Sequence, residues 1–491
     1  MRNKVRVLLI CLLIIVIVSA FFVGCNKKAP DLSGFSKENQ QAIVDFVNAY
    51  GKNSKSYNND AYIVSDFDNT TAIFDIAYQC SVYQIQTMAF AMNPQELRSA
   101  LSTYVEDDET SQKYINDIIN AYEQLIPLYG PFTPLGVEDE KLSEMQANIY
   151  WKEFAAKLKG LYTHIESVIS DENACAWILY WYTNMTENEV YELYKRSCLK
   201  YQDVDSYEVT WTSPSDIQSE MGVTSCSFIL GVSVTQSVKN MLLYYFENGI
   251  DTWICSASHV DGVRGAVDAY GLTDRITGVI GMTQKLVDGK FVSQYDYETG
   301  YPYVNNNGTW VKGDKPIKAL PAREGKVKAI QNYLIPKYNA GPLAGFMDAS
   351  GDFNFCTEFE SMKMVICYNR ADRKITEGAG LVAIAAVYQS DNKKDLLTAN
   401  SEGDTLYLLQ GRDENGKRSL RESNKTIKLG QTEEKLFRGQ ENETLYAYLT
   451  ENKLSIKDYF DTFCIKTSAQ DSAIGIAHGY LSEYSGYHSA K

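Results

Sequence analysis

Two carboxylates one residue apart are the part of the chain best suited to chemistry. They lie in the run Asp66-Phe67-Asp68-Asn69-Thr70, directly after the apolar run Tyr62-Ile63-Val64. A short apolar run bounded by polar residues is typical of a buried strand, and open α/β sheets bind ligands at the carboxyl ends of such strands. One aspartate can then act as a nucleophile and the other as a general acid and base. A turn would explain the same residues, so the choice depends on the rest of the chain.

Two downstream segments carry groups that fit an anionic substrate. Ser256 follows the apolar run 252–255, where its hydroxyl is suited to hydrogen-bond a phosphoryl oxygen, although a lone serine at a strand end is often only a turn residue. Lys326 follows Gly325 at the start of an expected helix. A helix N-terminus disfavours a cation, so this lysine indicates an anionic ligand, with a solvated surface lysine as the alternative.

Two further carboxylates, Asp348 and Asp352, follow a later apolar strand and are expected at the same edge of the sheet. Four acidic groups at one edge would repel one another strongly unless a cation neutralised them. Oxygen ligands without histidine or cysteine fit Mg²⁺. The sequence therefore predicts a magnesium site beside the first pair of aspartates.

In order and spacing, these four segments resemble the signature motifs of the haloacid dehalogenase superfamily of phosphatases, over about residues 62–368 without the insertion that follows the first motif. The resemblance implies that Asp66 forms an aspartyl-phosphate and that Asp68 protonates the leaving oxygen and then activates water. It also implies phosphate binding by Thr70, Ser256 and Lys326, and Mg²⁺ binding by Asp66, Asp68, Asp348 and Asp352, with Asp68 acting through its backbone carbonyl. The last motif commonly begins Gly-Asp-Ser and here reads Met347-Asp348-Ala349, which puts the geometry of that loop in question rather than its carboxylates.

Alternating strands and helices predict an α/β fold, a Rossmann-like doubly wound parallel sheet. A mainly helical cap is expected after the first motif, because that segment has apolar residues at three- and four-residue spacing. The expected divisions are a signal peptide (1–24), a linker (25–34), a catalytic core (35–80 and 232–375), a helical cap (81–231) and a C-terminal extension (376–491).

The N-terminus predicts export. A basic start, an apolar stretch from Val7 to Val23 and Gly24-Cys25 have the order of a secretory signal. Phe22-Val23-Gly24-Cys25 resembles a bacterial lipobox, which implies lipidation of Cys25 and a membrane anchor; a retained transmembrane anchor is the alternative. Both interpretations place the body of the protein outside the cytoplasm.

The composition limits the partners. A formal net charge of −15 argues against nucleic acid as a partner. The cysteines beyond Cys25 show no CxxC pair and no metal-like spacing with histidine, so we expect buried free thiols, with one disulfide in the cap as the alternative. Of the histidines only His259 lies near a motif, where a structural role is the main expectation and a position lining the phosphate pocket is the alternative. The sequence does not specify an oligomeric state.

The cap is expected to select the substrate, a small phosphomonoester. It contains Tyr150-Trp151 and the run Trp177 to Tyr182, and aromatic faces attract quaternary ammonium groups. Together with Phe74-Asp75-Ile76-Ala77, this insertion is similar to exported phosphorylcholine phosphatases of the superfamily. The aromatic residues are equally consistent with a core, which leaves a broad-specificity or phosphoserine-type phosphatase as the alternative. A non-catalytic, ligand-binding surface lipoprotein is the alternative from another class.

Overall fold

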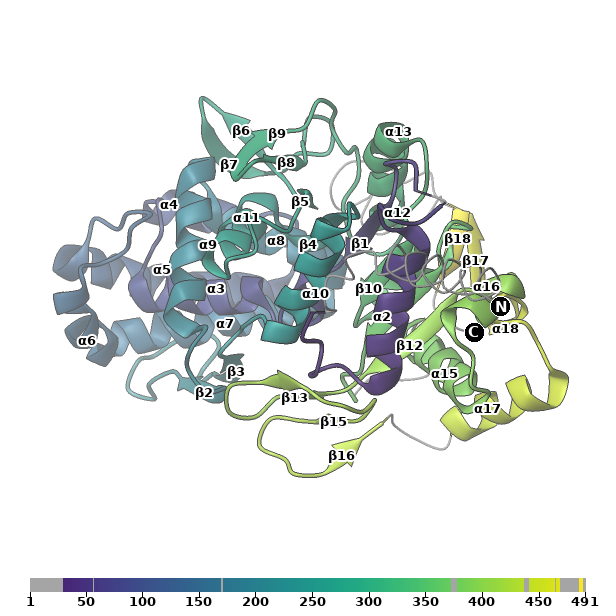
Figure 1. Cartoon of the computed structure of the whole chain (residues 1–491). Helices are drawn as coiled ribbons and strands as arrows, with labels where there is room; N and C mark the ends of the chain where they lie inside the picture. The colour runs from purple at the N-terminus through teal and green to yellow at the C-terminus, as the bar shows by residue number, and fades with distance from the viewer. Residues whose placement is uncertain are drawn as a thin grey trace, which may run out of the picture.

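An eight-stranded sheet lies at the centre of the fold (Figure 1). The computed structural model describes residues 30–55, 57–168, 171–371, 378–436, 441–463, 465–468 and 485–488. The expected signal sequence and Cys25 lie outside these residues. In spatial order the strands are β12 (Leu406–Gln410), β11 (Met364–Tyr368), β10 (Ala344–Met347), β1 (Tyr62–Ser65), β4 (Asp251–His259), β5 (Gly278–Met282), β8 (Tyr303–Asn306) and β9 (Thr309–Lys312).

The sheet is mostly parallel, as the sequence predicts. Each neighbouring pair from β12 to β5 is parallel, and the two remaining pairs at one edge, β5 with β8 and β8 with β9, are antiparallel. Successive side chains of a strand point to opposite faces, and here both faces are buried: Ile63 belongs to one apolar cluster, and its neighbours Tyr62 and Val64 belong to another. The predicted α/β fold class is therefore confirmed.

Helices cover both faces of the sheet. The face of Ile63 packs against α2 (Lys37–Tyr50), α10 (Gln236–Glu247), α11 (Val260–Ala269) and α16 (Leu396–Ser401). The face of Val64 packs against α12 (Glu324–Ala329), α14 (Phe353–Thr357), α15 (Gly378–Asp391), α17 (Glu441–Asn452) and α18 (Ile456–Phe463). In the described part of the chain no helix is both long and apolar enough to span a bilayer.

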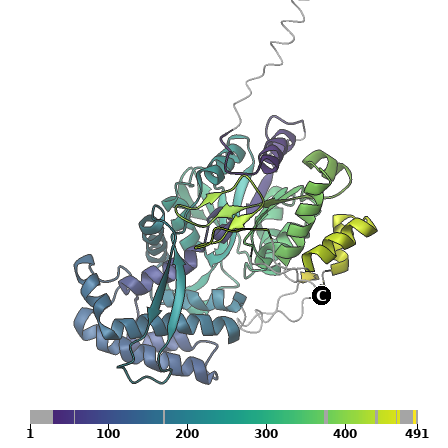
Figure 2. The same ribbon diagram turned by 90° about the horizontal axis from the view of Figure 1, so that it is seen from below.

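A mainly helical insertion separates β1 from β4, as expected. It forms the group of blue helices to one side of the sheet (Figures 1 and 2). Its elements are α3 (Ile76–Thr87), α4 (Pro94–Ser102), α5 (Glu109–Tyr129), α6 (Asp139–Ala147), α7 (Ile149–Val168), α8 (Asp171–Trp177), η2 (Ile178–Tyr182) and α9 (Glu187–Tyr201). It also contains a hairpin of β2 (Tyr207–Thr212) and β3 (Ser225–Leu230), which the helical interpretation of this segment did not include.

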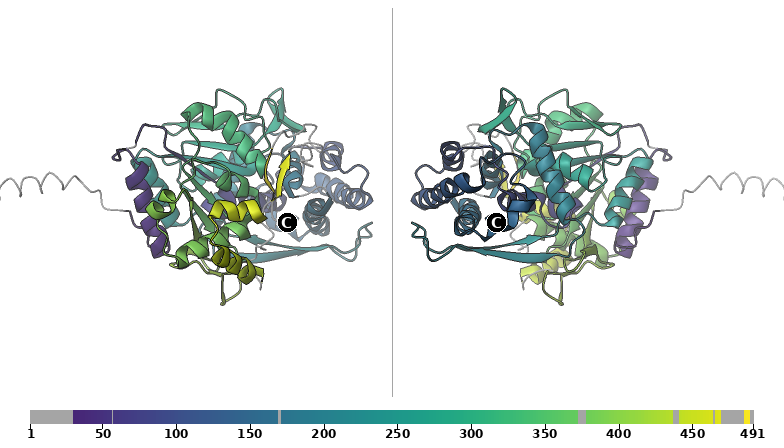
Figure 3. Two further views of the ribbon diagram at one scale, coloured as in Figure 1. Left: turned by 90° about the vertical axis from the view of Figure 1, so that its right-hand side faces the viewer. Right: turned by 90° about the vertical axis from the view of Figure 1, so that its left-hand side faces the viewer.

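The chain after residue 375, expected to be an extension, adds to the main sheet. β12 pairs in parallel with β11, and β13 (Arg412–Asp413), β14 (Ser419–Leu420), β15 (Thr426–Ile427) and β16 (Glu434–Lys435) form a small sheet beyond it. Helix α2, near the start of the described chain, contacts the same region: Asn39 of α2 donates from Nδ2 to Oε1 of Gln410 in β12 at 2.9 Å. Figure 3 shows α2, in purple, beside these green C-terminal elements.

The remaining elements are small. A hairpin that turns at Asp288-Gly289 joins β6 (Gln284–Val287) and β7 (Lys290–Tyr295). A second hairpin joins β17 (Ile465–Ser468) and β18 (Ser485–His488). Among the described cysteines, free thiols are found at Cys80, Cys198, Cys226, Cys255 and Cys356.

Candidate functional site

The carboxyl ends of β1, β4 and β10 meet at one point, because β1 lies between the other two strands. Asp66 follows β1 directly, and its backbone N–H donates to the carbonyl of Phe346 in β10 at 3.1 Å. Asp348 follows the end of β10, and Ser258 lies near the end of β4. Residues that are far apart in the sequence therefore share one edge of the sheet.

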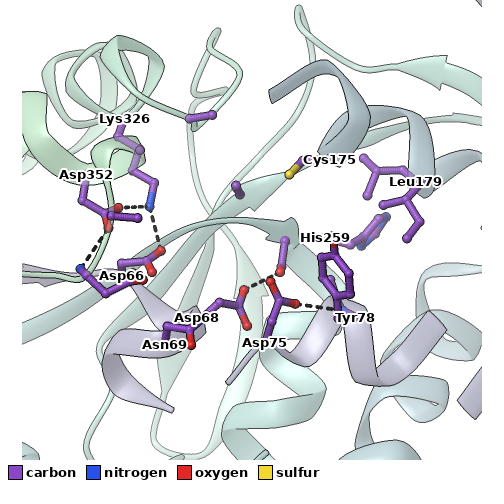
Figure 4. A pocket seen from close by; sticks show the side chains of 18 of the residues that line it. Asp66, Asp68, Asn69, Asp75, Tyr78, Cys175, Leu179, His259, Lys326 and Asp352 are labelled. Atoms are coloured by element: carbon purple, nitrogen blue, oxygen red, sulfur yellow. Dashed lines mark hydrogen bonds and ion pairs between the residues drawn. The ribbon is translucent and has the colours of Figure 1, made fainter. Parts of the chain in front are cut away.

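The chain turns sharply after Asp66, in η1 (Phe67–Thr71). Asp68 has extended backbone angles, and Asn69 is left-handed with φ 60° and ψ 0°. The turn is closed by two backbone hydrogen bonds, from Asn69 N–H to the Phe74 carbonyl and from Ala72 N–H to the Phe67 carbonyl, each 2.9 Å long. Asparagine tolerates the left-handed region better than most residues. The turn separates the two carboxylates, so Asp66 and Asp68 point to different partners (Figure 4).

Lys326 binds two of the carboxylates. Its Nζ donates to Oδ1 of Asp66 at 2.7 Å and to Oδ1 of Asp352 at 2.5 Å (Figure 4). The lysine belongs to α12, and the preceding Gly325 permits its position: a Cβ there would lie 1.7 Å from the carbonyl oxygen of Leu320. Burial alone would lower the pKa of Lys326, but Asp352 and Asp66 outweigh burial and raise that pKa well above its ordinary value. Lys326 is therefore a fixed cation.

Three buried carboxylates are close enough to share a metal ion. One oxygen of each of Asp66, Asp348 and Asp352 lies within 4.8 Å of the others. Asp348 also accepts hydrogen bonds from Thr70 Oγ1 at 3.1 Å and from Arg370 Nη1 at 3.0 Å. Burial and the carboxylates of Asp352 and Asp348 raise the pKa of Asp66 well above its ordinary value, despite Lys326. Since a bound cation would favour the ionised carboxylates, this set of oxygen donors fits Mg²⁺.

Asp68 has different surroundings. Its Oδ1 accepts from the backbone N–H of Ile76 at 2.7 Å, and its Oδ2 accepts from the hydroxyls of Ser258 at 2.6 Å and Ser256 at 3.4 Å. In the described part of the chain these donors, rather than a cation, hold the carboxylate. Burial and the nearby carboxylates of Asp75 and Asp66 raise the pKa of Asp68 well above its ordinary value. Asp68 is therefore suited to carry a proton.

A cavity of about 170 Å³ lies beside these groups. At one end it is lined by the residues that carry charge, Asp66, Asp68, Lys326, Asp348, Asp352 and Arg370. Asp75, which precedes α3, lies next to Asp68 (Figure 4). The insertion contributes Tyr78, Tyr162, Cys175, Ile178, Leu179 and Tyr194. The insertion therefore forms the wall opposite the sheet, the place from which a cap can select a substrate.

The structure brings together the residues that the four motifs predicted, with differences in detail. Asp66, Asp68, Lys326, Asp348 and Asp352 all line the cavity. Thr70 and Ser256 do not; they hydrogen-bond the carboxylates of Asp348 and Asp68 from behind. The hydroxyl that reaches the cavity from β4 is that of Ser258.

The aromatic residues considered for the substrate lie elsewhere. Trp151, Trp177 and Trp181 are at most 5% exposed and belong to the core of the insertion. The aromatic residues that line the cavity are instead the tyrosines Tyr78, Tyr162 and Tyr194. Spacing in the sequence could not distinguish these tyrosines from the many others, nor could it identify Arg370, which has no motif around it.

Comparisons with known proteins support the fold alone. No protein-family model matches the chain, and no curated protein matches it. The chain is similar to the solved structure of a conserved, functionally unknown protein from Anaerococcus prevotii DSM 20548, with 24% identity and a TM-score of 0.63, over 82% of this chain and 98% of that chain. A protein of unknown function from Bordetella pertussis Tohama I matches at 12% identity with a TM-score of 0.29, over 62% of this chain and 89% of that one. A cytosolic 5'-nucleotidase IIIB bound to cytidine matches at 12% identity with a TM-score of 0.27, over 68% and 78%.

Proposed function

We propose that this protein is a Mg²⁺-dependent phosphomonoesterase of the haloacid dehalogenase type. The observation that carries the proposal is the position of Lys326, which binds Asp66 and Asp352 within a group of three buried carboxylates. Binding alone does not need a nucleophile beside a fixed cation and a separate carboxyl group suited to carry a proton. This arrangement favours catalysis over a non-catalytic binding role.

The two aspartates have different roles in this proposal. The Asp66 carboxylate attacks phosphorus, the bond from phosphorus to the leaving oxygen breaks, and Asp68 gives its proton to that oxygen. Water then attacks the phosphorus of the aspartyl-phosphate and gives a proton to Asp68. The bond from phosphorus to Asp66 breaks, which releases phosphate and restores the carboxylate. Lys326 offsets negative charge on the phosphoryl oxygens during both displacements.

Asp66, Asp348 and Asp352 would hold Mg²⁺ through carboxylate oxygens. When bound, Mg²⁺ supplies positive charge that offsets the developing charge on the phosphoryl oxygens. Without such a cation, the cavity is lined by five carboxylates, those of Asp66, Asp68, Asp75, Asp348 and Asp352, against the two cations Lys326 and Arg370. The excess of negative charge is the physical reason to expect a divalent ion.

We propose further that the substrate is a small phosphomonoester with a compact cationic leaving group, of which phosphorylcholine and phosphoethanolamine are examples. The cavity, about 170 Å³, is comparable in size to the ~150 Å³ cavity that holds one benzene molecule. Asp75 and three tyrosines also line it, and Asp75 lies next to Asp68 (Figure 4). Lys159 already lies over two of these rings, 3.9 Å from the centroid of Tyr78 and 4.5 Å from that of Tyr162. Asp75 is therefore the group on which we base recognition of the cation.

The catalytic proposal is tested by phosphate release from p-nitrophenyl phosphate with Mg²⁺ or with EDTA. We expect release only with Mg²⁺, and a loss of at least ~1,000-fold in kcat in Asp66→Asn, because the amide is not a nucleophile. Asp288→Asn is the matched control: it makes the same change at a hairpin tip, where Asn-Gly is a favoured turn. Release without Mg²⁺, or full activity of Asp66→Asn, would contradict the proposed mechanism, and no release under either condition would leave the ligand-binding alternative.

The substrate proposal is tested with Asp75→Asn. Asp75 caps α3 by accepting from the N–H of Tyr78 at 2.8 Å, and asparagine caps helices equally well. We expect KM for phosphorylcholine and phosphoethanolamine to rise about 10-fold, the loss of one ionic contact of ~1.4 kcal/mol, with KM for p-nitrophenyl phosphate unchanged. Equal kcat/KM for cationic esters, phosphoserine and glycerol phosphate in the wild type would instead support the broad-specificity alternative.

We also propose, from the N-terminal sequence, that the protein is exported and anchored to a membrane through a lipid on Cys25. The lipobox-like run Phe22-Val23-Gly24-Cys25 supports this proposal. The variant Cys25→Ser separates the two forms of anchor. A lipoprotein is expected to lose metabolic labelling with palmitate and to leave the membrane fraction, whereas an apolar transmembrane anchor would keep the variant in that fraction.

A further inference from the structure

Asn69, in the turn between the two catalytic aspartates and the insertion, is bound by a residue from the far end of the chain. Arg412 of β13 donates from Nη1 to the backbone carbonyl of Asn69 at 2.9 Å and from Nη2 to its side-chain Oδ1 at 3.0 Å. The two residues are 343 positions apart in the sequence. A planar guanidinium that binds both the main chain and the side chain of one residue fixes its orientation as well as its position.

Arg412 is itself held in place by the carboxylate of Glu414. It is 1% exposed, and Oε1 of Glu414 accepts from its Nε at 3.0 Å and from its Nη2 at 2.7 Å. Lys428 Nζ donates to the same Oε1 at 3.2 Å, and the N–H of Leu429 donates to Oε2 at 3.2 Å. Burial alone would raise the pKa of Glu414, but Arg412 and Lys428 outweigh it and lower that pKa. An ionised Glu414 therefore holds Arg412 in one position.

Asn69 is well placed to pass this support on to Asp68. Asn69 is left-handed, with φ 60°. It follows Asp68, the residue proposed to carry the proton, so a fixed peptide group at Asn69 also fixes the carboxyl-terminal side of the Asp68 backbone. Asp68 must also keep its carboxylate against Ser258 and the N–H of Ile76. A turn that relaxed at Asn69 would release Asp68 from this position while leaving Asp66 on its strand.

We propose that Arg412 is a positioning residue for the proposed phosphatase reaction, acting through Asn69 to hold Asp68 in place for proton transfer. This inference rests on the proposed function. It assigns a role to the segment after residue 375: the small sheet of β13 to β16 completes the active site by supporting the turn that carries the general acid.

The test uses the dependence of rate on the leaving group. p-Nitrophenolate leaves as a stable anion and needs little protonation, whereas an alkyl alkoxide must be protonated as it leaves. In Arg412→Lys, which keeps the charge but loses the two-pronged contact, we expect the single-turnover rate of leaving-group release from an alkyl phosphate such as phosphoethanolamine to fall about 30-fold or more. We expect the single-turnover release of p-nitrophenolate to fall less than about 3-fold, because Asp68 is needed for this substrate only in the later attack of water, with both KM values within about 2-fold of wild type.

Arg421→Lys is the matched control. Arg421 lies in the same small sheet and pairs with Glu434, without contacting the catalytic turn. It should keep the wild-type ratio of the two rates. Asn69→Gly is the second variant, because glycine retains the left-handed turn but removes the Oδ1 acceptor. It should shift the ratio in the same direction as Arg412→Lys but by less, because the hydrogen bond from Arg412 Nη1 to the Asn69 carbonyl remains. The double variant should shift the ratio no further than Arg412→Lys alone.

Each outcome decides between possibilities. An equal fall of both rates, or no change in either, would overturn the role of Arg412 while leaving the phosphatase proposal intact. If Arg412→Lys fails to fold, Asn69→Gly decides alone, and an unchanged ratio there overturns the inference. A wild-type protein without phosphatase activity would contradict the proposed function itself.

Discussion

The surroundings of the residues near the cavity favour the charged form of some and the neutral form of others. His259, which is not one of the proposed catalytic residues, is an example. Its ring is fully buried against Tyr182 and Phe291. Its Nδ1 accepts from the backbone N–H of Asp261 at 3.1 Å, which places the proton of the neutral ring on Nε2. Burial, with a smaller contribution from Arg264, lowers the pKa of His259 to about 3.

This lowered pKa predicts a pH-dependent loss of stability. The unfolded chain binds a proton at His259 below a pKa of 6.5, whereas the folded chain does so only near 3. The contribution to stability is therefore complete above pH 6.5 and is lost as the pH falls towards 3. Asparagine at this position can still accept from Asp261 N–H, and it does not titrate. Between pH 6.5 and 5 we expect the wild type to lose about 2 kcal/mol more stability than His259→Asn.

Denaturant unfolding of both proteins at several pH values measures this difference. The smaller asparagine also loses packing, but that loss is the same at each pH and cancels from the comparison of slopes. Asp261, whose pKa burial raises to about 6, lies 3.7 Å from Nδ1 and is present in both proteins. Parallel pH profiles would mean that His259 accepts a proton in the folded state, contrary to its environment.

The residues of the candidate site differ in how far the sequence could reveal them. Asp66, Lys326 and Asp348 follow predictable strands or start a predictable helix, so local pattern and order along the chain are sufficient. Ser258 and Arg370 reach the cavity only through the bulge in β4 and the course of the chain after β11. Their positions depend on tertiary structure that no local pattern specifies.

At the scale of elements, α12 must approach the preceding loop closely to place Lys326. The helix expected to start at Gly325-Lys326 is present, divided among α12, η3 (Ile330–Leu334) and α13 (Ile335–Tyr338). Its close approach to the backbone at Leu320 explains the glycine before the lysine. Sequence analysis identified the Gly-Lys pair, but only the structure shows that the glycine is required for space rather than for flexibility.

Gly325→Ala is therefore expected to displace α12. A Cβ would lie 1.7 Å from a backbone oxygen, which cannot be relieved by rotating a side chain. We expect a loss of about 2–4 kcal/mol in stability and a large loss of phosphatase activity as Lys326 moves from Asp66. Gly351→Ala is the control for stability, because a Cβ there meets nothing within 4 Å. Thermal melting compares the two, and equal melting temperatures would show that α12 accommodates the extra carbon.

At the scale of the whole molecule, the N-terminal helix of the described chain packs against the segment that follows residue 375. α2 contacts β12 through Asn39 and Gln410, and Ser390 of α15 donates to Glu38 of α2 at 2.8 Å. The sequence placed a change of character near residue 375, since polar, charged segments follow it. Composition alone could not show that the apolar run of β12 pairs with β11, because strand pairing depends on the path of the chain.

This arrangement predicts that the C-terminal segment and the active site unfold together. Leu408 of β12 is 1% exposed and packs in the same apolar cluster as Ile63 of β1, whereas Leu397 of α16 is 68% exposed. Leu408→Ala should destabilise the fold by about 2–5 kcal/mol, and Leu397→Ala by less than ~0.5 kcal/mol. Because one sheet connects β12 to Asp66, the temperature at which phosphatase activity is lost should fall with the melting temperature in Leu408→Ala. If residues after 375 formed a separate unit, a new early transition would appear in the melt while activity persisted to the wild-type temperature.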